Sequence, residues 1–258
     1  MLSRRSVLKA SLGPCSCWVC GSPAIVNTSL AAQADQAIHI QGLGYDLRFV
    51  GAQRETIMNG KLAAALDLRT LERTPHLYGI GPIEQLRGEV TIAASRPSLA
   101  RVRPDGSIGV TESFEAGVPF LVWAQVPVWR ALPIPPEVRS FADLEAFVPR
   151  SAASVGLDPH KPLPFLIRGR ADLIEFHILN RIGDEAHNAE RHKKIQAVFE
   201  LEQAEAIIVG FHSAAHQGVF TPIGSAIHIH FQTADNSKSG HIQKLELGNN
   251  AVLELPHA

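Results

Sequence analysis

The chain has 258 residues, and its 24 lysine and arginine residues against 25 aspartate and glutamate residues give a formal net charge of −1. This balance lacks the basic footprint of a nucleic-acid-binding protein, so no nucleic-acid partner is expected. Hydrophobic residues make up 45 % and charged residues 19 %, which excludes extensive disorder and predicts a well-supplied core.

The first 34 residues resemble an export signal of the twin-arginine (Tat) type. The paired Arg4-Arg5 precedes a moderately apolar stretch, and Ala32-Gln33-Ala34 has the small-x-small pattern of a signal-peptidase site. We therefore divide the chain into a signal peptide, residues 1–34, and one mature domain, residues 35–258. The mature protein is expected to be exported, either to the periplasm or as a secreted protein. Its apolar runs are shorter than the roughly 20 residues of a membrane span, so no membrane contact is expected after cleavage.

All three cysteines, Cys15, Cys17 and Cys20, lie in the predicted signal peptide. Cleavage would leave a mature chain without cysteine, which excludes disulfides, cysteine catalysis and thiolate metal sites. A lipoprotein anchor at Cys20 is the alternative, but Cys17-Trp18-Val19 lacks the small aliphatic residues that such a site needs.

The mature chain is predicted to be rich in strands, with helices near its start and middle. A helix is expected over residues 57–66, interrupted by Gly60. A second helix begins at Ser140, which with Asp143 has the pattern of a capping box. The basic run Arg191–Lys194 reads as a solvated loop. Strands are expected at 89–92, 98–102, 119–124, 165–168, 173–179, 195–201, 206–211, 227–231 and 242–247. The predicted fold class is α+β, with mixed or antiparallel sheets in one domain or two closely packed halves.

A histidine pattern near the C-terminal end is typical of a metal site. His228 and His230 form a His-x-His pair, and because side chains alternate along a strand, both imidazoles are expected on one face. The turn-rich loop Asp235–Gly240 and the alternating segment 242–247 predict a hairpin that brings His241 back beside them. Three imidazoles are the usual protein ligands of an open metal site. The alternative is two exposed strand histidines and an unrelated third.

Other histidine patterns give weaker signals. Cupins use a His-x-His pair followed by an acid, and Asp235 follows His230, but their last histidine comes many residues later than His241 does here. His212 and His216 are spaced for one helix face, yet they follow a strand and precede a glycine, which favours a surface loop. Whether that loop lines the site is left open. His177 reads as a core or cross-strand histidine.

Several segments occur in a characteristic order. They are Gly79-Ile80-Gly81 leading to Gly88-Glu89, Pro119-Phe120, Phe165-Leu166-Ile167-Arg168, Gly210-Phe211, and the histidine segment ending in Gly240-His241. In this order and spacing the chain resembles the alpha-acetolactate decarboxylase family from about residue 55 to 255. In that family, too, the third histidine follows the second by eleven residues.

The resemblance implies an acetolactate-decarboxylase-like fold and a zinc ion held by His228, His230 and His241. It also implies that Glu89 and Arg168 project into the site as catalytic residues. The family's reaction releases carbon dioxide from 2-acetolactate and forms acetoin. In such a site the metal would stabilise the enediolate as a Lewis acid, Arg168 would orient the carboxylate or an oxyanion, and Glu89 would deliver the proton.

Some residues depart from the family pattern. Pro82, Glu84 and Arg87 stand where the family usually has threonine, asparagine and aspartate. The family's C-terminal extension, which supplies another glutamate, is shorter here, and Glu254 is a candidate substitute. These differences leave two alternatives open. One is a metal-dependent enzyme acting on another small oxo or hydroxy acid, and the other is a non-catalytic binding protein with a structural metal.

Three further points stay open in the sequence. Arg170 is an alternative to Arg168 as the arginine of the site, since both would lie on the same strand face. The simpler interpretation of either residue is a surface salt bridge. The expected partner is a small-molecule 2-hydroxy-3-oxo acid. The fourth metal ligand is not identified, and a homodimer is compatible with the sequence, which does not set the oligomeric state.

Overall fold

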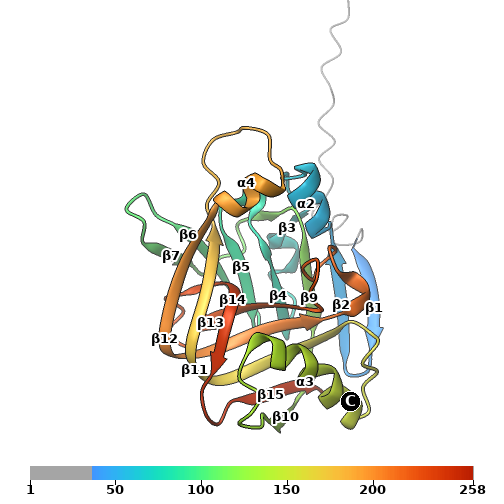
Figure 1. Cartoon of the computed structure of the whole chain (residues 1–258). Coiled ribbons are helices and arrows are strands. Elements are labelled where there is room, and N and C mark those ends of the chain that lie inside the picture. Colours follow the sequence, from blue (N-terminus) through green and yellow to red (C-terminus); the bar gives the residue numbers. More distant parts are fainter. Residues whose placement is uncertain (1–36, 258) are drawn as a thin grey trace, which may run out of the picture.

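The computed structural model describes residues 37–257, which form two antiparallel sheets packed against each other, with helices at their ends (Figure 1). The predicted signal peptide and its three cysteines lie outside the described residues. Among residues 37–257, no helix has the length and apolar character needed to cross a membrane.

The first sheet is a seven-stranded antiparallel sheet with the strand order β1-β2-β9-β4-β5-β6-β7. Its strands are β1 (Ile38–Gly42), β2 (Tyr45–Val50), β4 (Leu77–Pro82), β5 (Glu89–Ala93), β6 (Arg96–Val102), β7 (Ile108–Thr111) and β9 (Leu121–Gln125). A separate two-stranded ribbon pairs β3 (Leu66–Asp67) with β8 (Gly117–Val118). β5 lies inside the sheet and is buried along its whole length, which places Glu89 at the buried start of a central strand.

The second sheet has six strands in the order β10-β15-β11-β12-β13-β14. They are β10 (Trp129–Pro133), β11 (Leu163–Leu179), β12 (Gln196–His212), β13 (Ile227–Thr233), β14 (Ser239–Leu247) and β15 (Val252–Pro256). β14 also pairs with the second half of β11, so β11, β12, β13 and β14 close into a ring. β12, β13 and β14 pack on β5 of the first sheet.

Within residues 37–257, three α-helices and three short 3-10 turns cover the ends of the sheets. The helices are α2 (Gln53–Asn59), α3 (Phe141–Ser154) and α4 (Ala189–Lys194), and the turns are η1 (Leu68–Leu71), η2 (Glu84–Leu86) and η3 (Ala214–His216). α2 and α4 lie side by side at one end of the molecule, at the top of Figure 1. α3 packs on β12 and β14 near the opposite end and buries Leu144 and Val148.

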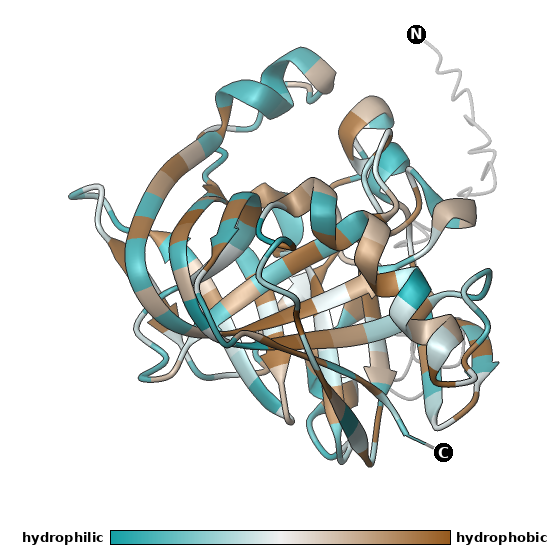
Figure 2. Ribbon diagram, turned by 60° about the horizontal axis from the view of Figure 1, so that its bottom comes forward, coloured by the Kyte–Doolittle hydropathy of each residue, from teal (hydrophilic) through white to brown (hydrophobic). Residues whose placement is uncertain are grey.

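The main hydrophobic core lies between the two sheets and inside the ring of long strands. It includes Phe165, Phe176, Phe211 and Phe231, all fully buried. Apolar and polar residues alternate along the long outer strands (Figure 2), because one face of each strand meets the core and the other meets solvent. A second cluster around Leu66, Val90 and Trp123 covers part of the first sheet.

The structure confirms the α+β class and most predicted strands. It also confirms the capping box, in which the Ser140 hydroxyl accepts from the Asp143 N–H while the Asp143 carboxylate accepts from the Ser140 N–H. One helix prediction and one loop prediction were wrong. The helix expected over 57–66 lies at Gln53–Asn59, because Gly60 adopts a left-handed conformation (φ 63°) and caps it, and the run Arg191–Lys194, expected as a loop, belongs to α4.

Candidate active site

β13 carries the predicted His-x-His pair. Its alternation places Ile227, Ile229 and Phe231 in the core of the strand ring, all fully buried. His228 and His230 therefore face the other way, toward the first sheet, and they too are buried, with exposed fractions of 1 % and 0 %. Two neighbouring imidazoles in a sheet interface require a ligand or hydrogen-bond partners, because burying a polar group without either is costly.

His241 reaches the same place through the returning strand. β13 and β14 form an antiparallel hairpin in which His230 and His241 are direct cross-strand partners, so their side chains lie on one face. The preceding Gly240 allows β14 to approach β11 closely. A Cβ atom there would lie 2.6 Å from the Phe176 ring and 3.0 Å from the His177 carbonyl oxygen.

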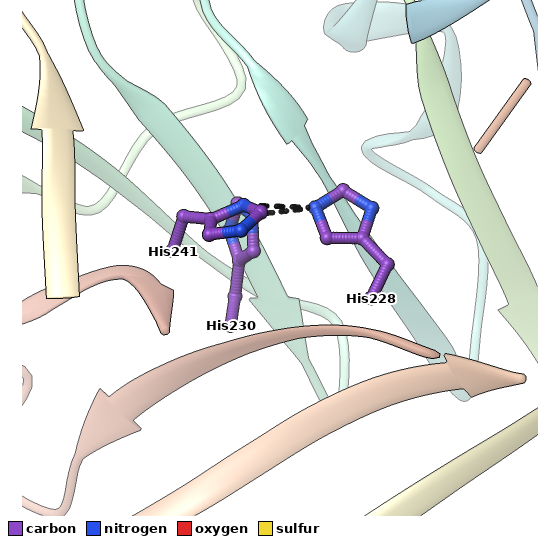
Figure 3. Close-up of side chains that lie close together, drawn as sticks. All are labelled: His228, His230 and His241. Atoms are coloured by element: carbon purple, nitrogen blue, oxygen red, sulfur yellow. Dashed lines mark hydrogen bonds between the residues drawn. The ribbon is translucent and has the colours of Figure 1, made fainter. Parts of the chain in front are cut away.

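The three imidazoles converge on one point (Figure 3). The Nε2 atom of His228 lies 3.1 Å from Nδ1 of His241 and 3.2 Å from Nε2 of His230. All three candidate ligand nitrogens lie within 4.8 Å of one another. Nitrogens bound tetrahedrally to zinc at about 2.0–2.1 Å would be about 3.3–3.4 Å apart. The spacing and the donor set therefore fit a divalent metal ion.

Hydrogen bonds on the far side of two rings orient their free nitrogens toward this point. His228 Nδ1 donates to the Phe220 carbonyl oxygen at 2.7 Å, so the neutral ring presents an unprotonated Nε2 to the site. His230 Nδ1 lies 3.3 Å from the hydroxyl of Thr91 on β5, and that hydroxyl accepts from Ser239 at 2.8 Å. Partners of this kind fix the ring orientation of metal ligands.

Burial also keeps the three rings neutral. It lowers the pKa of His228 to about 4, although the Phe220 carbonyl opposes the shift. For His230 and His241 the pKa is well below the ordinary value, again chiefly because of burial and then because of the neighbouring imidazoles. Neutral imidazoles are the form that binds metal, so the site needs no proton release at neutral pH.

Glu89 enters the site from the first sheet. Its side chain is 2 % exposed, and Oε2 lies 3.9 Å from Nε2 of His230. Burial raises the pKa of Glu89 well above its ordinary value, and the backbone N–H of Leu179 opposes that shift. Its Oε1 atom is buried without a hydrogen-bond partner. The structure thus brings Glu89 to the histidines, in surroundings where desolvation favours the neutral carboxyl over the carboxylate.

His177, which the sequence suggested only as a core or cross-strand histidine, belongs to the same group. It is the cross-strand partner of His241 between β11 and β14, and the two rings stack with centroids 4.5 Å apart. Its Nε2 lies 3.7 Å from Oε1 of Glu89. The signal in the sequence was its position on an apolar strand, which did not reveal the strand it would pair with.

A pocket of about 320 Å³ opens onto this group. Glu89, His177, His228 and His241 line it together with side chains from α2 and α4, which frame its mouth. Apolar residues form much of the remaining wall: Ile57, Pro82, Leu86, Phe120, Leu179, Pro222 and Ile223. A concave, mainly apolar site with a few convergent polar groups is the usual form of a small-molecule site.

The structure does not place Arg168 among the residues that line this pocket. Its Nε donates a hydrogen bond to Oε2 of Glu254 at 2.9 Å, between β11 and β15. Glu254 is therefore held by Arg168, and Arg170 faces Asp172 at 3.7 Å. The catalytic role of Arg168 stays a prediction.

The residues that depart from the family pattern have different surroundings. Pro82 lines the pocket, whereas Arg87 forms an exposed ion pair with Asp184 at 3.3 Å. His212 and His216 are absent from the lining. His212 ends β12 and is buried, which corrects the expected surface loop at that position, and His216 contacts the Ser213 hydroxyl at 2.8 Å.

Comparisons with known proteins match this chain to a sequence family and to solved structures of similar fold. The model of the alpha-acetolactate decarboxylase family matches residues 51–257. Similar folds occur in a Staphylococcus aureus protein of unknown function described as similar to that enzyme (TM-score 0.66, 17 % identity, 81 % of this chain and 84 % of that one). They also occur in the alpha-acetolactate decarboxylase of Bacillus subtilis strain 168 (TM-score 0.64, 18 % identity, 81 % of this chain and 85 % of that one). A third similar structure is the acetolactate decarboxylase of B. subtilis subspecies spizizenii (TM-score 0.62, 16 % identity, 81 % of this chain and 85 % of that one). Comparison with curated protein sequences gives no match.

Proposed function

This chain belongs to the alpha-acetolactate decarboxylase family, and on that basis we propose that it converts 2-acetolactate to acetoin and carbon dioxide with the help of zinc. The observation that carries the proposal is the buried carboxyl of Glu89 beside three convergent imidazoles, in a pocket of small-molecule size. Three nitrogen ligands favour zinc over magnesium or calcium, which prefer oxygen ligands.

The reaction breaks the bond between the carboxylate carbon and the carbon that bears the hydroxyl group. The electron pair of that bond moves toward the neighbouring keto group and gives an enediolate. A zinc ion held by His228, His230 and His241 would supply a Lewis acid for the developing negative charge. A proton is then added to the carbon that lost carbon dioxide, and acetoin results.

Glu89 is suited to deliver that proton. The carboxyl is buried between the sheets, faces the histidines and keeps its proton because desolvation disfavours the charged form. Each turnover consumes one proton, which Glu89 would deliver and solvent would restore. The apolar wall around it limits access of water to the enediolate.

The test is an assay of the purified mature chain. We expect about one zinc ion per chain, acetoin formation from racemic acetolactate, and loss of both on treatment with a chelator. Bound zinc without acetoin formation would reject acetolactate as the substrate and leave another small oxo or hydroxy acid. If the protein binds no metal at neutral pH, both enzymatic hypotheses are rejected: action on acetolactate and action on another small oxo or hydroxy acid.

A further inference from the structure

The pocket has a second set of polar side chains, apart from the histidines assigned to the metal. His177 on β11 and His192 on α4 both line it, and each has a buried Nδ1 atom without a hydrogen-bond partner. His177 is only 5 % exposed. A buried imidazole nitrogen left unpaired costs free energy, and such groups usually have a partner in the functional state of a protein.

The two histidines occupy the side of the pocket that leads from Glu89 to the mouth. His177 lies at the inner end, 3.7 Å from Glu89 and stacked on His241. His192 lies further out, on the face of α4 that lines the pocket, and its ring meets His187 edge-on at 5.5 Å. α4 is held against α2 at this end of the molecule (Figure 1).

The charges around the mouth have the same sign. Arg54 on α2 and Lys193 on α4 are exposed and line the pocket. Glu89 is the one acid among the described lining residues, and it is buried at the far end. A pocket with cationic groups at its mouth attracts and orients an anion.

We propose that His177 and His192 bind the carboxylate of the substrate, with Arg54 and Lys193 guiding it in. The proposal rests on the proposed function and deepens it, because it assigns to two imidazoles the contact that the sequence assigned to Arg168. Both imidazoles can donate an N–H to a carboxylate oxygen. The substrate's keto and hydroxyl oxygens are then left to face the three metal-ligating histidines.

The chemistry of decarboxylation suits neutral donors at this position. The carboxylate loses its negative charge as carbon dioxide forms, so a buried cation would stabilise the starting state more than the transition state. Neutral N–H groups orient the carboxylate but bind it less strongly than a buried cation would. The cations Arg54 and Lys193 remain at the mouth, where they act on entry.

The test compares two ligands by calorimetry on zinc-loaded protein, and therefore needs no turnover. One ligand is 2-hydroxyisobutyrate, which has a carboxylate, and the other is acetoin, which has none. In His177→Gln and His192→Gln we expect the affinity for 2-hydroxyisobutyrate to fall at least tenfold and that for acetoin to change less than twofold. Zinc content should equal that of the wild type. His160→Gln, which changes an exposed histidine outside the pocket lining, should alter neither affinity.

An equal loss of affinity for both ligands, or no change in either affinity, would overturn the proposal. His192→Gln alters only a surface helix, so it decides the question if His177→Gln does not fold. Failure of the wild type to produce acetoin would reject the proposed function separately, since the ligand comparison does not depend on acetolactate being the substrate.

Discussion

Arg168 and Glu254 form a hydrogen-bonded ion pair that joins β11 to the last strand, β15, with Nε 2.9 Å from Oε2. Their side chains are 41 % and 17 % exposed, so solvent screens the pair only in part. We expect a coupling energy of about 0.5–1 kcal/mol in a double-mutant cycle of Arg168→Ala and Glu254→Ala, measured by urea unfolding.

The same variants test the role that the sequence assigned to Arg168. Because Arg168 lies outside the pocket lining, we expect kcat and KM of Arg168→Ala to stay within about threefold of the wild type. A fall in kcat of more than about tenfold, in a variant that keeps its zinc and its fold, would restore Arg168 as a catalytic residue.

Glu89→Gln keeps the size of the side chain and removes its acid. We expect kcat to fall by about 10²–10⁴, which is the usual contribution of a general acid, while zinc content stays unchanged. Steady-state kinetics and metal analysis measure the two effects. Glu84→Gln, an exposed neighbour on η2, is the matched control and should behave as the wild type. A Glu89→Gln variant that turned over within tenfold of the wild type would remove the proposed proton donor.

Thr91→Val should weaken zinc binding without loss of the fold. The variant removes the hydroxyl that lies 3.3 Å from Nδ1 of His230, and loss of such an orienting partner typically costs 10–100-fold in metal affinity. Competition with a chromogenic chelator measures the change. The control is Thr70→Val. The Thr70 hydroxyl donates to the Asp67 carbonyl oxygen at 2.8 Å, away from the site. Equal zinc affinities in the two variants would contradict the orienting role.

Tyr45 predicts a loss of stability at alkaline pH. Its hydroxyl donates to the Pro162 carbonyl oxygen at 2.5 Å, and burial, aided by the charge of Asp158, raises its pKa to about 12 from 10.0. A raised pKa means that the contribution is fully present below pH 10 and is lost as the pH rises toward 12. The loss amounts to roughly 3 kcal/mol. Between pH 8 and 12, the free energy of unfolding of the wild type should fall relative to that of Tyr45→Phe. A constant difference between the two proteins over this range would disprove the assignment.

Local patterns in the sequence were enough to predict the metal-binding part of the site. Strand alternation and one turn place His228, His230 and His241 together, because all three lie on a single hairpin. The capping box at Ser140 was equally local. Glu89 was found through a family resemblance, since nothing in its neighbourhood reveals which strands will cover it.

Features that depend on distant parts of the chain were missed. The segments 165–168 and 173–179, predicted as separate strands, belong to one long strand, β11, which contains Gly169 at a positive φ of 132°. The second half of β11 pairs with β14 and places His177 beside His241 and Glu89. The contact between Arg168 and Glu254 joins residues 86 positions apart, which no periodicity can indicate.

The hairpin that carries all three proposed ligands has a consequence for how the protein acquires its activity. The ligands lie within fourteen consecutive residues, from His228 to His241, whereas the acid comes from the other sheet. The first sheet also supplies the Thr91 hydroxyl beside His230, so it supports both the proposed metal site and the acid. Damage to the contact between the sheets would therefore weaken metal binding and remove the proton donor from the site at the same time.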